Sequence, residues 1–323
     1  MRTDKILYVV VPCYQEEAVL PETAKRLKRE LARLLESEKI APESRILFVN
    51  DGSKDRTWRI IEELHTADPI YAGVNLSRNR GHQFALLAGL ETAAQHADMI
   101  VSMDADLQDD IGAMEKMIDA YHEGYDVVYG VRSERKTDTW FKRTTAQGFY
   151  KLMNLLGAEV IYNHADYRLM SRRAVEGLME FSEVNLFLRG IVPQVGYKWT
   201  TVEYARAERY AGESKYPLKK MLAFALNGVT SFSVRPMRLI LLLGGVVFLI
   251  SIIMMLWTLV CRIAGNTVGG WSSLMCSIWM LGGIQLLSLG VIGEYIGKIY
   301  SETKRRPRFI IERVLLRSED KEK

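Results

Sequence analysis

Cysteine is scarce in this chain, and the pattern of the few present excludes cross-linked and zinc-bound scaffolds. The 323 residues include three cysteines, Cys13, Cys261 and Cys276, which are widely separated and form no C-x-x-C pair. Neither a disulfide framework nor a zinc site is therefore indicated. The five histidines also form no ligand-like cluster along the sequence, although His82 lies in a motif and is a candidate for lining a donor site.

Long basic tracts are absent as well. The formal net charge is +4, but no Lys/Arg tract interleaved with aromatic residues occurs, so nucleic-acid binding is not expected. A signal peptide is not indicated, because the apolar run at residues 6–11 is too short and is followed by Pro12. We therefore expect the first domain to stay in the cytoplasm.

Charged residues nearly vanish from the region 239–292. Residues 239–260 and 271–292 form two uncharged stretches, and the loop between them holds one charged residue, Arg262. As a helix, either stretch spans roughly 33 Å, which is enough for the core of a bilayer. We expect two transmembrane helices, and a buried hairpin of soluble helices is the alternative.

Basic residues flank this region on its two outer sides. They are Lys215, Lys219, Lys220, Arg235, Arg238, Lys298, Lys304, Arg305, Arg306 and Arg308. Because positive charge favours the cytoplasmic side, both termini and the catalytic domain are expected there, in a multi-pass protein of the cell inner or plasma membrane. Apolar positions opposite lysines in residues 217–232 predict a helix in the membrane interface, or alternatively a plain connector helix.

The first two thirds of the chain alternate strand-like and helix-like segments. Short apolar runs predict buried strands at residues 6–11, 46–49, 71–76, 99–103 and 127–129. Helical patterns occur at residues 18–37, 57–64 and 84–94. This alternation predicts βαβ units and a mostly parallel sheet, with ligands bound beyond the carboxyl ends of the strands.

Four polar clusters follow these strands, at residues 13–16, 50–53, 77–82 and 104–108. Asp104 and Asp106 stand two positions apart at a strand end, where both carboxylates can reach one divalent ion that also holds a diphosphate. A pair of surface aspartates is the alternative. Asp51 and Glu16 offer acceptors for uracil or ribose donors, although Asp51 also fits a turn or a helix cap.

Several segments resemble the signature series of family 2 glycosyltransferases. They are residues 12–17 (Pro-Cys-Tyr-Gln-Glu-Glu), 50–53 (Asn-Asp-Gly-Ser), 79–83 (Asn-Arg-Gly-His-Gln), 104–109 (Asp-Ala-Asp-Leu-Gln-Asp) and 212–216 (Gly-Glu-Ser-Lys-Tyr). More narrowly, they resemble the polyisoprenyl-phosphate branch of dolichol-phosphate mannose synthases and bactoprenol glucosyltransferases. Residues 293–300 and 306–309 are similar to its bacterial two-span members. The chain departs from the pattern at Gln15, where Asn is usual, and at residues 110–111, where prolines are usual.

The resemblance implies a GT-A fold, a nucleotide diphosphate-sugar donor and a cation, Mg²⁺ or Mn²⁺, held at Asp104, Asp106 and Gln108. The residues expected to bind the nucleotide-sugar are Pro12, Tyr14, Glu16, Asp51, Asp104, Arg209 and Lys215. The segment around residues 212–216 contains glycine beside basic residues, which suits a loop that closes over a diphosphate or an acceptor phosphate. Ser214 in this segment is expected to bind the acceptor phosphate. These basic residues also fit a face turned to anionic lipid headgroups.

Asp166 resembles the family's proposed catalytic base, and Asp166 and Asp106 are the expected catalytic residues. A phosphate monoester is mostly dianionic at neutral pH, so its oxygen needs little proton abstraction. Our hypothesis is that Asp166 chiefly orients the acceptor and balances arginine charge. Arg132 and Arg135 follow a strand and are candidates to bind the lipid phosphate, whereas a solvated charged loop is the alternative.

The expected architecture is an α/β GT-A domain at residues 1–214, an interface segment at 215–236, a transmembrane hairpin at 237–292 and a basic cytoplasmic tail at 293–323. The expected reaction is inverting transfer of a hexose from a donor of the UDP-glucose type to undecaprenyl or another polyisoprenyl phosphate. A homotetramer is expected from the family resemblance. A processive polysaccharide synthase and a non-catalytic subunit that binds sugar nucleotides are the alternatives.

Overall fold

The computed structural model describes residues 4–132, 164–183, 188–205, 235–264 and 270–316. The chain divides into two compact units. The first comprises Met1–Gln147, Val160–Tyr216 and Arg306–Lys323, and the second comprises Gly148–Glu159 and Pro217–Arg305. The predicted interface helix at 217–232 lies outside the described residues.

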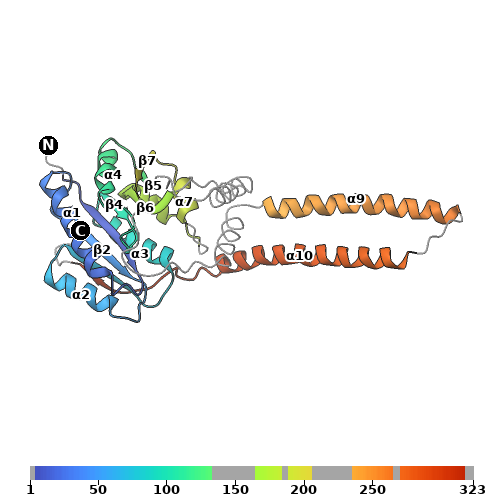
Figure 1. The fold of residues 1–323 in the computed structure, drawn as a ribbon, viewed down its shortest axis with the longest axis horizontal. Coiled ribbons are helices and arrows are strands. Elements are labelled where there is room, and N and C mark those ends of the chain that lie inside the picture. Colours follow the sequence, from blue (N-terminus) through green and yellow to red (C-terminus); the bar gives the residue numbers. More distant parts are fainter. Residues whose placement is uncertain (1–3, 133–163, 184–187, 206–234, 265–269, 317–323) are drawn as a thin grey trace. The chain divides into compact units, whose positions relative to one another are not determined.

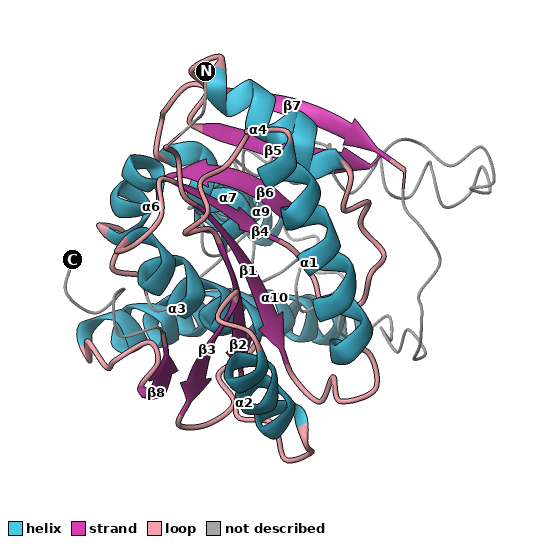
Figure 2. Ribbon diagram, turned by 90° about the vertical axis from the view of Figure 1, so that its left-hand side faces the viewer, coloured by secondary structure: helices cyan, strands magenta, loops and turns pink. Residues whose placement is uncertain are grey.

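The described part of the first unit is built on an eight-stranded sheet in the order β7-β5-β6-β4-β1-β2-β3-β8. The strands are β1 (Leu7–Cys13), β2 (Arg45–Asn50), β3 (Tyr71–Leu76), β4 (Met99–Ser102), β5 (Val127–Arg132), β6 (His164–Ser171), β7 (Trp199–Tyr204) and β8 (Ile311–Leu315). Figure 2 shows the strands fanning across this unit with helices on both sides.

The sheet is mixed, with four parallel and three antiparallel strand pairs among the described strands. Strands β1 to β4 pair in parallel, as the strand-helix alternation predicts. By contrast, β6 runs antiparallel to both β4 and β5, and β8 runs antiparallel to β3. The sequence did not predict β6, because polar Asp166 and Arg168 alternate with apolar residues within it and interrupt the apolar run.

Helices pack on both faces of the sheet. They are α1 (Leu20–Glu36), α2 (Thr57–Ala67), α3 (His82–Ala94), α4 (Ala113–His122), α6 (Arg172–Met179) and α7 (Leu188–Gln194). Buried side chains of α1, α2 and α4 join one apolar core with alternate residues of β1, β2 and β4. On the opposite face, α3 lies against β1, β2 and β4 and also contacts α6.

Gly89 allows α3 to approach the sheet closely. A Cβ atom at this position would lie 2.4 Å from Val10 Cγ1 and 2.7 Å from Val49 Cγ2. We expect Gly89→Ala to destabilise the protein by about 1–3 kcal/mol through overpacking, which lowers the thermal midpoint by several degrees. Gly112→Ala is the matched control, because its nearest neighbour is Asp110 Oδ1 at 3.3 Å. Equal midpoints for the two variants would contradict this account.

The described part of the second unit contains two long helices, α9 (Arg235–Ile263) and α10 (Trp271–Thr303). They lie side by side and run in opposite directions (Figure 1). Large apolar side chains such as Leu242, Ile253, Trp257, Leu286 and Leu289 are exposed on them. Helices that are apolar on all sides require an apolar environment.

Within the described residues, one segment of helix, Met280–Thr303, is long and apolar enough to cross a membrane, and none of it is buried. A shorter apolar segment, Gly244–Met254, lies in α9. The expectation of two transmembrane helices is thus matched by one candidate, and the second span stays a prediction.

The segment predicted as a basic tail contains regular structure. Helix α10 continues to Thr303, and strand β8 follows at Ile311–Leu315 and joins the sheet of the first unit. No strand was predicted here, because charged Glu312 and Arg313 interrupt the apolar pattern.

Candidate active site

The carboxyl ends of β1, β2 and β4 meet at one edge of the sheet. Cys13 at the end of β1 pairs with Asn50 of β2, and Val10 pairs with Ser102 of β4. The loops that follow these strands turn sharply through residues with positive φ, namely Gln15, Gly52 and Leu107. The polar residues after each strand therefore converge, as expected for parallel strands.

Asp51 joins two of these loops. Its carboxylate is 2% exposed and accepts hydrogen bonds from the backbone N–H groups of Arg80 at 2.6 Å and Gly81 at 2.8 Å. Gly52 makes this approach possible, because a Cβ atom there would lie 2.4 Å from the Asn79 nitrogen. Burial raises the pKa of Asp51, while the two backbone donors favour its ionised form.

The loop after β1 is fixed by hydroxyl groups from the loop after β2. The backbone N–H of Gln15 donates to Ser53 Oγ, and that of Glu16 donates to Thr57 Oγ1, both at 3.0 Å. Pro12 is buried within β1, whereas Tyr14 is 43% exposed. Tyr14 is thus the accessible aromatic side chain at this edge.

The acidic segment lies beyond β4. Asp106 Oδ1 accepts a hydrogen bond from the backbone N–H of Gln108 at 3.2 Å, and Gln108 itself is buried. The Asp104 side chain is 38% exposed, and its Oδ1 lies 3.6 Å from His82 Nε2. Partial burial and the carboxylates of Asp166, Asp109 and Asp106 raise the pKa of Asp104, although His82 opposes this.

The side chains of this acidic cluster are chemically suited to bind a divalent cation. Among the described residues, no three His, Cys, Asp or Glu side chains are arranged as a complete metal site. However, Asp104 and Asp106 supply two carboxylates, and one or two carboxylates with substrate phosphates suffice for Mg²⁺. A cation here would relieve the mutual repulsion that raises the pKa of Asp104.

Asp166 lies next to this segment because β6 pairs with β4. Ser102 Oγ donates to the Asp166 carbonyl at 2.6 Å. The Asp166 carboxylate accepts hydrogen bonds from Arg168 at 2.9 Å and from Arg189 at 3.1 and 2.9 Å. His82 Nε2 lies 3.9 Å from Asp166 Oδ2, so the imidazole stands between Asp104 and Asp166.

The two arginines keep Asp166 ionised. Burial opposes ionisation, but the guanidinium groups of Arg189 and Arg168 hold the pKa of Asp166 well below its ordinary value. Arg168 is 2% exposed, and its Nη1 has no hydrogen-bond partner among the described residues. A carboxylate held in this way is a weak base with a fixed negative charge, and its orienting role stays a prediction.

Neither of these arginines was predicted from the sequence as a site residue. Arg168 stands two positions after Asp166, and strand alternation puts such a pair on one face. That spacing could have identified Arg168. Arg189 is the second residue of α7, and the sequence gives no comparable signal for it. Helix α7 is anchored at its start, where the Leu188 N–H donates to Gln83 Oε1 at 2.9 Å.

The described residues do not test the other expected site residues. Arg132 ends β5, beside Tyr204 of β7, and β6 separates β5 from β4. Arg135, Arg209, Ser214 and Lys215 lie outside the described residues. The phosphate-binding roles of these basic residues stay predictions.

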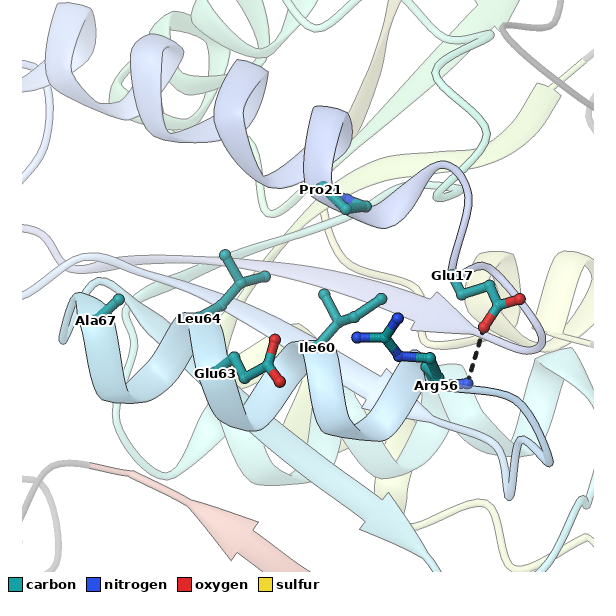
Figure 3. A pocket seen from close by; sticks show the side chains of 7 residues that line it. All are labelled: Glu17, Pro21, Arg56, Ile60, Glu63, Leu64 and Ala67. Carbon is teal, nitrogen blue, oxygen red and sulfur yellow. Dashed lines mark hydrogen bonds between the residues drawn. The ribbon is translucent and has the colours of Figure 1, made fainter.

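A separate cavity of about 560 Å³ lies between the start of α1 and helix α2 (Figure 3). Its lining residues are Glu17, Pro21, Arg56, Ile60, Glu63, Leu64 and Ala67. A hydrogen bond from the Arg56 N–H to Glu17 Oε2 crosses one end of it. None of the aspartates of the strand-end cluster lines this cavity.

A parallel β1–β4 core with antiparallel β6 beside it, and aspartates at the ends of β2 and β4, defines a GT-A-like α/β fold. This is the fold of glycosyltransferases that use nucleotide-sugars. The family description "Glycosyl transferase family 2" matches residues 8–179, and "GtrB C-terminal hairpin" matches residues 235–299. The chain belongs to glycosyltransferase family 2 and is an enzyme.

Relatives match nearly the whole chain. It is 53% identical to the uncharacterized glycosyltransferase YkoT of Bacillus subtilis (strain 168), over 96% of this chain and 92% of that protein. It is 44% identical to the prophage bactoprenol glucosyl transferase homolog of Escherichia coli (strain K12), over 95% and 98%. It is 42% identical to the bactoprenol glucosyl transferase of Shigella phage SfX, over 94% and 97%. These matches agree with the polyisoprenyl-phosphate branch of the family.

Proposed function

We propose that this enzyme transfers a hexose from a nucleotide-sugar of the UDP-glucose type to undecaprenyl phosphate or another polyisoprenyl phosphate. One observation carries the proposal. Asp104 and the ion-paired Asp166 face the same imidazole, His82, in a chain that is 42% identical over 94% of its length to a protein named bactoprenol glucosyl transferase. A donor subsite and an acceptor subsite then lie side by side.

The donor binds at the ends of β1, β2 and β4. Exposed Tyr14 packs on the base, and Glu16 and Asp51 bound the nucleoside pocket, with Pro12 beneath it. The diphosphate lies toward Asp104 and Asp106, and these residues with Gln108 would hold Mg²⁺ or Mn²⁺. When bound, the cation would offset the charge of the diphosphate leaving group.

The acceptor phosphate lies on the Asp166 side. Its oxygen attacks the anomeric carbon, the bond from that carbon to the diphosphate oxygen breaks, and the nucleoside diphosphate leaves with inversion. Since the phosphate is mostly dianionic near neutral pH, no strong base is required. Asp166 fixes Arg189, which is partly exposed and carries positive charge toward the incoming phosphate.

The second unit anchors the enzyme at the membrane. Exposed apolar side chains of α9 and α10 suit a lipid environment, and the catalytic unit and both termini are assigned to the cytoplasmic side by the basic flanks. Gly293 and Gly297 on α10 have the spacing of close helix contacts, which supports a homo-oligomer such as a tetramer.

A donor panel tests the proposed function. Purified full-length protein is incubated with Mg²⁺ or Mn²⁺, undecaprenyl phosphate and one of several donors, including UDP-glucose, UDP-N-acetylglucosamine and GDP-mannose, and the lipid product is detected by mass. We expect a lipid that carries a single sugar, with a UDP-sugar preferred. Formation of a polymer would favour a processive synthase, and no transfer with any donor would contradict the proposal.

A further inference from the structure

The chain returns to the catalytic sheet after α10, through residues 307–315, which we name the C-terminal strap. Strand β8 of the strap pairs with β3, and the N–H of Ser77 donates to the Ile310 carbonyl at 3.0 Å. Residues 304–306 alone separate the end of α10 from the strap. The strap therefore connects a membrane helix directly to the donor half of the sheet.

Arg80 holds the strap with its side chain and Asp51 with its backbone. Its Nε donates to the Arg308 carbonyl at 2.7 Å, and its Nη2 donates to the Pro307 carbonyl at 2.9 Å. The N–H of the same residue donates to Asp51 Oδ1 at 2.6 Å. Arg80 thus connects the turn at residues 79–81 to the strap on one side and to Asp51 on the other.

A second polar connection runs parallel to the first. Glu312 of the strap accepts a hydrogen bond from Asn75 Nδ2 at 2.8 Å, and Asn75 Oδ1 accepts one from Asn50 Nδ2 at 2.6 Å. Asn50 immediately precedes Asp51. The two connections from the strap therefore end at Asn50 and Asp51, on the nucleoside side of the site.

The turn at residues 79–81 needs such support. Gly81 has φ of +92°, and no atom of the described residues lies within 4 Å of where its Cβ would be. Glycine adopts many backbone conformations, so an unsupported turn here would sample several of them. The N–H groups of Arg80 and Gly81 donate to Asp51, and the Gly81 carbonyl accepts from the N–H groups of Phe84 and Ala85 at 3.1 Å.

We propose that Arg80 is a positioning residue for the donor: it uses the docked C-terminal strap to hold the 79–81 turn against Asp51, so that the nucleoside side of the site is formed before the donor arrives. This inference rests on the proposed function, which assigns Asp51 to the nucleoside pocket. It makes donor affinity depend on a segment joined directly to the membrane helix α10.

Arg80→Ala and Arg80→Lys in the full-length protein test this role. The control is Arg313→Ala, which removes a strap contact to Glu62 of α2 at 2.6 Å from a side chain that is 61% exposed. The measurements are UDP affinity by calorimetry with Mn²⁺, hydrogen exchange at the amides of residues 80 and 81, and the KM for undecaprenyl phosphate. We expect Arg80→Ala to weaken UDP binding about tenfold and to accelerate exchange at both amides, with the acceptor KM unchanged.

Arg80→Lys should recover part of both losses, because an ammonium group can donate to one of the two carbonyls. Unchanged exchange at residues 80 and 81 in Arg80→Ala would overturn the inference, and so would an equal loss of UDP affinity in Arg313→Ala. If the wild-type protein does not bind UDP, the proposed donor is wrong, and the exchange rates still decide whether Arg80 positions the turn.

Discussion

Asp104→Asn and Asp106→Asn are each expected to abolish sugar transfer, with kcat/KM reduced about a thousandfold or more. Each substitution removes one of two carboxylates that are available for the cation, and charge stabilisation of this kind is commonly the largest single contribution to catalysis. The measurement is the transfer assay with undecaprenyl phosphate, together with Mn²⁺ affinity of the same preparations. Both variants should lose Mn²⁺ binding in the presence of UDP.

The fold should survive these substitutions. The pKa of Asp104 is raised, so its ionised form is disfavoured in the folded protein, and this cost grows as the pH rises through the ordinary carboxyl range. Without metal, Asp104→Asn should therefore be as stable as the wild type or slightly more stable. Asp110→Asn is the nearby control, because asparagine can still accept the hydrogen bond from the Gly112 N–H. Substantial transfer by Asp104→Asn, above about a tenth of wild type, would contradict the metal role.

Asp166→Asn is expected to have the largest effect on stability. The substitution leaves the buried guanidinium of Arg168 without its counter-charge, and breaking a buried ion pair in this way typically costs about 3–5 kcal/mol. The thermal midpoint of the purified variant measures this loss. The double variant Asp166→Asn with Arg168→Met should recover much of it, because it removes the unpaired charge as well.

The pH dependence of the same variant separates orientation from base catalysis. Because the pKa of Asp166 is lowered, its contribution to stability is complete above its unfolded value near 4 and is lost only as the pH falls through the lower folded value. Between pH 5 and 8, Asp166 stays ionised and should add no limb to the rate profile. The profile should instead follow the acceptor phosphate, whose second pKa is about 6.

If Asp166 orients the acceptor, Asp166→Asn should bind the lipid phosphate more weakly and keep the shape of the pH–rate profile. Loss of activity at every pH with unchanged affinity for the lipid phosphate would instead support a catalytic base. Both the affinity and the pH profile must be measured on preparations of equal folded fraction, since the stability loss would otherwise lower the rate.

The sequence predicted those parts of the fold that have a local signal. Strands β1 to β3 are short apolar runs whose two buried faces leave no ambiguity, and the aspartates that follow β2 and β4 are visible as motifs. Strand β6 was not predicted, because it carries Asp166 and Arg168 inside the sheet, where a purely apolar run was expected. Strand β8 escaped because an edge strand tolerates charge on its exposed side.

The aspartates of the candidate site were easier to predict from the sequence than its arginines. Asp104 and Asp106 were predicted from their spacing together with their place at the end of an apolar strand. The pairing of Arg189 with Asp166 depends on the position of α7 in the folded unit, and no periodicity in the sequence indicates that position. Asp51 directly follows β2, and both of its carboxylate oxygens accept backbone N–H groups, as the alternative of a turn residue predicts. Its role in nucleoside binding stays a prediction.

The place of β8 in the sheet also has a consequence for biosynthesis. The open side of β3 gains its neighbour from a segment that the ribosome makes after both α9 and α10. Until that segment emerges, β3 presents unpaired backbone groups of the kind that favour aggregation. The catalytic unit is therefore completed last, after the apolar helices have been synthesised. A fragment that ends before α9 would keep every aspartate of the site and still have an unfinished sheet.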